Sequence, residues 1–140
     1  MHLGQILVAQ RLVTKPTLDA AMQRQRKQGG RLGYQLVAMG ALTPEQLTAA
    51  LARQRDLEAA VTASARSLRT VRIQHGEMNR QTVRARQELG RAYLAAGQAA
   101  DALSLSESAL QEYRKAFGAE HVYTREMAKL AADARAALKA

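Results

Sequence analysis

The apolar residues in the first part of the chain recur with the period of a helix, and the same pattern occurs twice. Each copy predicts a short helix, a turn and a longer helix. In the second copy, Leu32, Leu36 and Val37 form the apolar stripe of the short helix. The longer helix repeats its stripe at i, i+3, i+4 and i+7, so that one face carries Leu47, Ala50, Leu51 and Gln54.

The two copies align without a gap when residues 2–25 are laid over residues 31–54. Eleven of the 24 aligned pairs are identical. Two helical hairpins in tandem predict a small four-helix bundle over residues 1–55. The identical pairs are Leu3/Leu32, Gly4/Gly33, Leu7/Leu36, Val8/Val37, Ala9/Ala38, Thr14/Thr43, Leu18/Leu47, Ala20/Ala49, Ala21/Ala50, Arg24/Arg53 and Gln25/Gln54.

The ends of the helices in the second copy are marked by residues with known capping preferences. Gly40 is placed to end the short helix, because glycine accepts the left-handed conformation found at helix stops. Thr43 is the expected N-cap of the longer helix, with Pro44 in its first turn. Gln46 lies three residues after Thr43 and completes a predicted capping box.

A second repeat with a period of 42 residues organises residues 56–140, where residues 75–82 align with residues 117–124. The pattern predicts four antiparallel helices. The first is the second helix of an incomplete repeat, the next two form one full repeat, and the last closes the array. Their expected ranges are 56–74, 79–97, 99–117 and 121–138, with Gly97 turning the chain between the middle two.

The small and apolar residues of this region have the spacing of a tetratricopeptide repeat. The region resembles the kinesin-light-chain type, which implies a surface for binding a partner protein. Arg86 and Ser106 depart from it, since large apolar residues usually stand there. One and a half repeats are too few to be stable on their own, so we expect them to pack against the N-terminal bundle or against a second copy of the chain. The residues that carry the resemblance are Leu89, Gly90, Tyr93, Ala102 and Ala109.

Composition fits an all-α protein and excludes several other classes. Among the 140 residues there is no Cys and no Trp, so disulfides and thiol chemistry are excluded. No apolar run approaches the roughly 20 residues that span a bilayer, and no secretion signal is evident. We therefore expect a cytoplasmic protein. The net charge of +9 is uneven, because residues 1–55 hold eight Lys and Arg against two acidic residues.

Three features of the repeated phrase suggest binding of an anionic, base-containing ligand. Gly33 opens a helix, where free backbone N–H groups attract anions and a missing Cβ gives room. Arg31 can bind a phosphate or stack on a base. Gln54 offers a donor and an acceptor to the edge of a base. Taken singly, each residue has a simpler explanation. Gly33 can serve helix packing, Arg31 can be a solvated charge, and Gln54 can mark the polar rim of an apolar stripe.

The motif repeated at residues 2–25 and 31–54 resembles the MshEN domain, the N-terminal domain of type II secretion and type IV pilus ATPases. Its pattern is R-L-G-x-x-L-x-x-x-G followed by L-x-x-A-L-x-x-Q, used twice across five residues. The resemblance implies that cyclic di-GMP, a nearly two-fold symmetric ligand, is bound by both copies. The candidate ligand-binding residues are His2, Leu3, Gly4, Leu7, Leu18, Met22, Gln25, Arg31, Leu32, Gly33, Leu36, Leu47, Leu51 and Gln54.

The first copy departs from this pattern at two positions. His2 stands where the family has Arg, and it is only partly charged near neutral pH. Arg11 stands where the family has Gly, so it must adopt a strained helix-ending conformation, or the turn is built differently. We expect the first motif to bind more weakly than the second.

The favoured function is therefore a cyclic di-GMP receptor and adaptor, without enzymatic activity and without a metal or other cofactor. The chain has no P-loop motif and no carboxylate pair or nucleophile–base spacing. One alternative is a scaffold that keeps a degenerate nucleotide site. Nucleic-acid binding is less favoured, although residues 66–91 hold seven Arg against Glu77 and Glu88. The expected partners are cyclic di-GMP, an unidentified protein and, as an alternative, a second copy of the chain.

Overall fold

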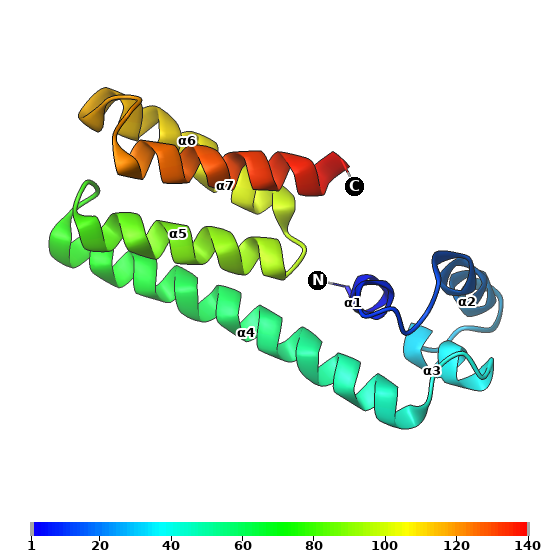
Figure 1. Cartoon of the computed structure of the whole chain (residues 1–140). Coiled ribbons are helices and arrows are strands. Elements are labelled where there is room, and N and C mark those ends of the chain that lie inside the picture. The colour runs from blue at the N-terminus through cyan, green and yellow to red at the C-terminus, as the bar shows by residue number, and fades with distance from the viewer. Residues whose placement is uncertain (1, 140) are drawn as a thin grey trace. The chain divides into compact units, whose positions relative to one another are not determined.

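The computed structural model describes residues 2–139 and consists of helices joined by short turns (Figure 1). No strand occurs among these residues, so the expected all-α class is confirmed. None of the helices in the described range is both long enough and apolar enough to cross a membrane. The helices are α1 (Leu3–Ala9), α2 (Lys15–Gln28), α3 (Leu32–Ala38), α4 (Pro44–His75), α5 (Arg80–Ala95), α6 (Ala99–Phe117) and α7 (Val122–Lys139).

The chain divides into two compact units, the first ending at Asp56 and the second beginning at Leu57. This boundary lies one residue from the predicted one. It falls inside α4, a single helix of 32 residues. The sequence predicts a second helix starting near residue 56, whereas the structure continues the helix of the second motif without a break.

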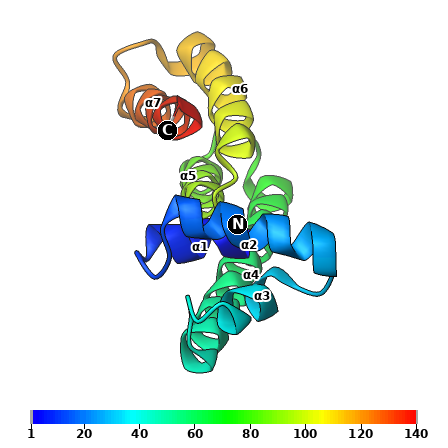
Figure 2. The same cartoon turned by 90° about the vertical axis from the view of Figure 1, so that its right-hand side faces the viewer.

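The first unit contains α1, α2, α3 and the first turns of α4, and α2 lies against both short helices (Figure 2). The predicted capping box at the start of α4 is present. The Gln46 backbone N–H donates to Thr43 Oγ1 at 3.1 Å, and the Thr43 N–H donates to Gln46 Oε1 at 3.0 Å. At the equivalent place in the first copy, Thr14 Oγ1 accepts from the Thr17 N–H at 3.3 Å. The same local chemistry starts the longer helix of each copy.

The turn after α1 has the same construction as the turn after α3, although one uses Arg11 and the other Gly40. Arg11 has a φ of 59° and Gly40 a φ of 74°. The Arg11 N–H donates to the Val8 carbonyl at 3.0 Å, and the Gly40 N–H donates to the Val37 carbonyl at 3.0 Å. Arg11 therefore takes the left-handed conformation that an L-residue adopts only at a cost. Of the two possibilities raised by the sequence, the strained helix end is the one observed.

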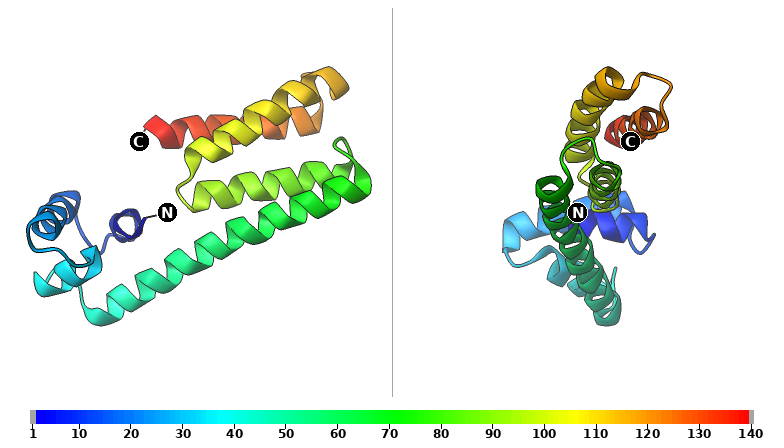
Figure 3. Two further views of the ribbon diagram at one scale, coloured as in Figure 1. Left: turned by 180° about the vertical axis from the view of Figure 1, so that it is seen from behind. Right: turned by 90° about the vertical axis from the view of Figure 1, so that its left-hand side faces the viewer.

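The second unit is built from α5, α6, α7 and the later turns of α4. Helix α6 runs antiparallel to α5 and α7 and packs on both, as Figure 3 shows from behind. The bounds of α5, α6 and α7 agree with the predicted ranges to within two residues, and Gly97 has a φ of 74° at the predicted turn. One core cluster joins these three helices through Val83, Ala109, Leu110, Tyr113, Met127 and Leu130.

Two of the positions that depart from the repeat pattern are buried polar residues with defined partners. Ser106 is fully buried and donates to the Ala102 carbonyl at 2.7 Å. Arg86 is 5% exposed and donates to Glu77, to Glu112 at 3.2 Å and to the Tyr113 hydroxyl at 3.3 Å. Its guanidinium carbon also lies 5.6 Å from the centroid of the Tyr113 ring. Polar contacts at Arg86 thus replace the apolar packing that the repeat pattern leads one to expect.

The ionisation of Arg86 and Tyr113 follows from this cluster. Burial opposes the charge of Arg86, but the hydrogen bond to Tyr113 and the carboxylates of Glu112 and Glu77 outweigh it and raise the guanidinium pKa. Burial raises the pKa of the Tyr113 hydroxyl, and the hydrogen bond from Arg86 offsets only part of that rise. Near neutral pH the cluster therefore holds a charged Arg and a neutral Tyr.

The arginine-rich stretch at 66–91 does not form one solvated basic face. Arg86 is inside the core, and Arg72 pairs with Glu77 at 3.0 Å. Arg84 lies 3.8 Å from Glu88 on the surface of α5. Arg86 is therefore not a solvated charge, because Glu77, Glu112 and Tyr113 of its own unit surround the guanidinium.

Replacing Arg11 by Gly is expected to stabilise the hairpin of α1 and α2 by about 1 kcal/mol, because the left-handed conformation costs glycine little. Amide hydrogen exchange of α1 and α2 measures the local opening free energy directly. Gly40→Ala is the matched control and should destabilise the equivalent turn by a similar amount. Faster exchange in Arg11→Gly than in the parent chain would contradict the strain.

Candidate ligand-binding site

The second motif surrounds a cavity of about 440 Å³ within the first unit. Three elements form it: the start of α3, the first two turns of α4, and Leu3 at the start of α1. Five of the candidate residues predicted from the second motif lie on its wall, and Leu3 adds one from the first motif. The lining residues are Leu3, Arg31, Leu32, Gly33, Tyr34, Val37, Pro44, Leu47, Thr48 and Leu51.

The charge at this cavity comes from Arg31. It is exposed at the N-cap of α3, and its backbone carbonyl accepts from the Gln35 N–H at 3.2 Å. The guanidinium has no ion-pair partner within residues 2–139. It is the only charged side chain on a wall that is otherwise mostly aliphatic. The cavity therefore has one positively charged side chain, that of Arg31, beside an apolar wall.

Gln54, the last residue of the second motif, lines a neighbouring cavity of about 290 Å³. Thr48 and Leu51 belong to the walls of both cavities, so the two lie next to each other along α4. Arg55 adds a second positive charge beside Gln54. The spacing i, i+4, i+7 along α4 therefore places Leu47, Leu51 and Gln54 along one surface, as the sequence predicts.

The repeated glycines are sites of close helix packing. A Cβ atom on Gly33 would lie 2.6 Å from Leu47 Cδ1, and one on Gly4 would lie 3.1 Å from Leu18 Cδ1. The prediction that the missing Cβ of Gly33 leaves room for a ligand is therefore wrong, because Leu47 of the following helix fills that space. Gly33 still lines the cavity through its backbone.

Two predicted ligand contacts, Leu7 and Leu36, are core residues instead. Both side chains are 0% exposed. They occupy equivalent positions in the two copies and point into the interior of the unit, where a ligand on the surface cannot reach them. The repetition of these leucines reflects packing, which the sequence cannot separate from binding.

The candidate residues of the first motif are arranged less favourably than those of the second. His2 is exposed and its backbone N–H donates to Gln5 Oε1 at 3.1 Å. Gln25 uses its amide nitrogen to donate to the Gly30 carbonyl at 3.0 Å. Met22 is 38% exposed and Leu18 is half-buried against Gly4. Only Leu3 joins the cavity of the second motif.

The structure adds residues that the repeat did not indicate. Tyr34 is 67% exposed on the wall of the cavity, and the aligned residue of the first copy is Gln5. Gln35 is 3% exposed, and its side chain donates to the Gly29 carbonyl at 2.8 Å, which holds the spacer in place. A search for repeated residues misses Tyr34 because it is unique to the second copy. The sequence signal that could have indicated Tyr34 is its position in the second motif, one residue after Gly33.

The remaining chemical candidates in the sequence have structural roles or no grouping. His121 stacks on Phe117 with ring centroids 4.7 Å apart, and its Nδ1 accepts from the Tyr123 N–H at 3.1 Å. Across residues 2–139, no three His, Asp or Glu side chains are grouped as metal ligands. The chain matches no protein-family model, no curated protein and no solved structure.

The close packing predicts unequal effects of Gly33→Ala and Gly4→Ala. At Gly33 the new methyl group must displace Leu47, so we expect the hairpin of α3 and α4 to lose about 1–2 kcal/mol. At Gly4 the gap is wider, and the gain of roughly 1 kcal/mol in helix propensity should cancel the crowding. Hydrogen exchange within each hairpin measures both effects. Equal losses at the two positions would contradict the packing difference.

Proposed function

We propose that this chain is a cytoplasmic, non-enzymatic receptor for cyclic di-GMP, with the helices of the second unit acting as the adaptor part that binds a partner protein. The observation that carries the proposal is the cavity at the second motif. There Arg31, at the start of α3, lies on the same wall as Leu47 and Leu51 of α4, and Gln54 lines the neighbouring cavity.

The chemistry of this wall suits one half of a cyclic dinucleotide. A guanine base can bury its faces against the leucines, which contribute by removing apolar area from water. Arg31 can bind a phosphate with two parallel hydrogen bonds or stack on the base. The ring of Tyr34, largely exposed beside Arg31, offers a second stacking surface.

The two copies are expected to contribute unequally to binding. Leu3 already belongs to the wall of the second-motif cavity. His2 is exposed and does not line this cavity, and the amide nitrogen of Gln25 donates to the Gly30 carbonyl. We therefore infer that the second motif supplies most of the affinity, and that the first motif mainly supports the fold.

A second candidate function is a scaffold with a degenerate nucleotide site. The roles of Gly4 and Gly33 favour it, because both are explained by packing against Leu18 and Leu47 without a ligand. The full burial of Leu7 and Leu36 points the same way. Under this alternative Arg31 is a solvated charge, and the apolar cavity beside it has no assigned role.

Calorimetric titration with cyclic di-GMP tests the proposal. We expect saturable binding, with Arg31→Ala weakening it at least tenfold, equivalent to about 1.4 kcal/mol, through loss of a charge-assisted contact. Gln54→Ala should weaken it by a smaller factor, and His2→Ala least. Arg53→Ala is the matched control, because Arg53 is an exposed residue of α4 outside both cavities.

Cyclic di-AMP and GTP serve as ligand controls in the same titration. Absence of heat at roughly hundred-micromolar ligand would reject cyclic di-GMP and favour the scaffold. Binding that Arg31→Ala and Arg53→Ala weaken equally would show that the positive charge acts only from a distance and not in the cavity.

A further inference from the structure

A second arginine lines the surface that begins at Arg31. The exposed side chain of Arg55, on α4, belongs to the wall of the cavity of about 290 Å³. This cavity shares Thr48 and Leu51 with the larger cavity beside Arg31. Within residues 2–139, the guanidinium of Arg55 has no ion-pair partner. Arg55 directly follows Gln54, the last residue of the second motif, so the motif itself does not include it.

The two adjacent cavities match the charge of a dianion. Among the described residues, their walls carry Arg31 and Arg55 and no Asp or Glu. Cyclic di-GMP has two phosphates with one negative charge each, so one arginine is present for each phosphate. Arginine binds phosphate oxygens through charge-assisted hydrogen bonds, which are roughly twice as strong as hydrogen bonds between neutral groups. The larger cavity alone supplies only one of these two cations.

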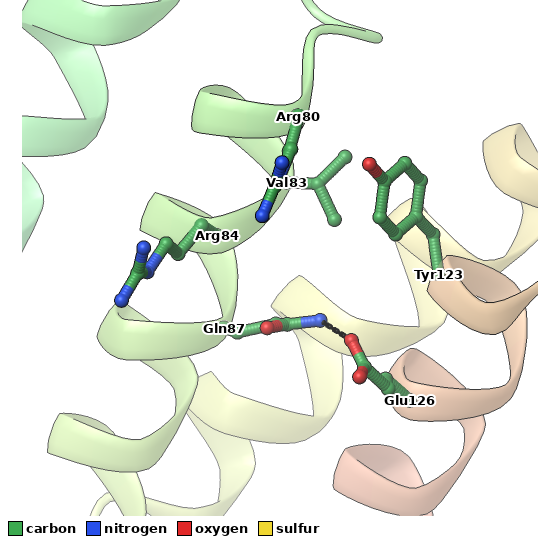
Figure 4. Close-up of a pocket in the computed structure, with 6 residues that line it drawn as sticks. All are labelled: Arg80, Val83, Arg84, Gln87, Tyr123 and Glu126. Atoms are coloured by element: carbon green, nitrogen blue, oxygen red, sulfur yellow. Dashed lines mark hydrogen bonds between the residues drawn. The ribbon is translucent and has the colours of Figure 1, made fainter.

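Cavities of the second unit have carboxylates on their walls. In the cavity between α5 and α7, Gln87 donates to the carboxylate of Glu126, as Figure 4 shows. Glu126 also lines the cavity next to it, and Glu77 and Glu112 line a third cavity beside α6. A phosphate placed in any of these three meets a negative charge that repels it. An anionic dinucleotide is therefore better matched by the cavities of the first unit.

The length of the surface suits a ligand that is extended along α4. Arg55 follows Leu47 by eight residues, and that number of residues spans about 12 Å of an α-helix. In an elongated cyclic di-GMP molecule, the two guanines point away from each other on opposite sides of the ring that contains the phosphates. One guanine can therefore lie against Leu47 in the larger cavity while the other lies against Leu51 in the smaller one.

We propose that one cyclic di-GMP molecule binds in this elongated form along α4, and that Arg55 binds the half of the ligand that lies outside the cavity beside Arg31. The first copy is not placed to take this half, because His2 lines neither cavity and the Gln25 amide nitrogen donates to the Gly30 carbonyl. This binding mode rests on the proposed function and adds to it a ligand conformation and a binding residue.

Comparing cyclic di-GMP with GMP, which corresponds to one half of it, tests the role of Arg55 in the full chain. Calorimetry should give one cyclic di-GMP per chain, and Arg55→Ala should weaken its binding at least about fivefold through loss of a charge-assisted contact. Binding of GMP is followed by NMR of the Leu47 methyl groups, because Leu47 lines the cavity beside Arg31 and not the neighbouring one. GMP affinity measured there should be unchanged in Arg55→Ala and weakened in Arg31→Ala.

Arg26→Ala is the matched control, because Arg26 aligns with Arg55 between the two copies, is exposed on α2 and lines neither cavity. Alanine maintains the helix propensity of both positions, so neither variant is expected to unfold. Unchanged cyclic di-GMP affinity in Arg55→Ala would overturn the inference. So would two ligands per chain, an equal loss in Arg26→Ala, or an equal loss of GMP affinity at Leu47.

Each of these results leaves cyclic di-GMP binding by the parent chain, and with it the proposed function, standing. A parent chain that binds no cyclic di-GMP would instead reject both the proposed function and this binding mode.

Discussion

The close approach of helices through single glycines is the constraint on which both units depend. A chain without Trp and with one Phe fills its interior with Ala, Leu and Val, so its helices must come close to exclude water. In the first unit, Leu47 occupies the space beside Gly33 where a Cβ would be. In the second unit, a Cβ on Gly90 would overlap the end of Leu130, a core residue of α7. Each contact fixes a surface: the first positions Leu47 on the wall of the cavity beside Arg31, and the second brings α5 beside α7.

Much of the architecture could be predicted from the sequence because its signals are local. Capping residues mark the start of α4, and the glycines at 97 and 118 mark helix ends, where both have positive φ. The repeat patterns place a helix boundary at residue 56 because two different periods meet there, although no Gly or Pro occurs at positions 45–75 to end a helix. The structure keeps α4 continuous, and the packing of the finished units divides it between them.

The sequence predicts which motif forms the cavity, but it does not separate the residues on the cavity wall from those in the core. A repeated residue can be kept for packing or for binding, and the sequence gives both the same signature. Leu36 and Leu51 have the same chemistry and belong to the same motif, yet one is buried and the other is 40% exposed on the cavity wall. Burial depends on the partner helix, which periodicity alone does not reveal. Arg86 is the converse case, a charged residue whose buried place depends on Glu77, Glu112 and Tyr113 meeting around it.

The proposed function requires a cyclic dinucleotide to bind in the cavity beside Arg31. Methyl-resolved NMR of leucine-labelled protein during addition of cyclic di-GMP tests this requirement, because the leucines on the cavity wall are distinct from those in the core of the second unit. Binding in this cavity should give saturable shifts for Leu3, Leu47 and Leu51, and none for Leu110 and Leu130 in the core of the second unit. Unchanged methyl signals throughout, or shifts confined to the second unit, would contradict it.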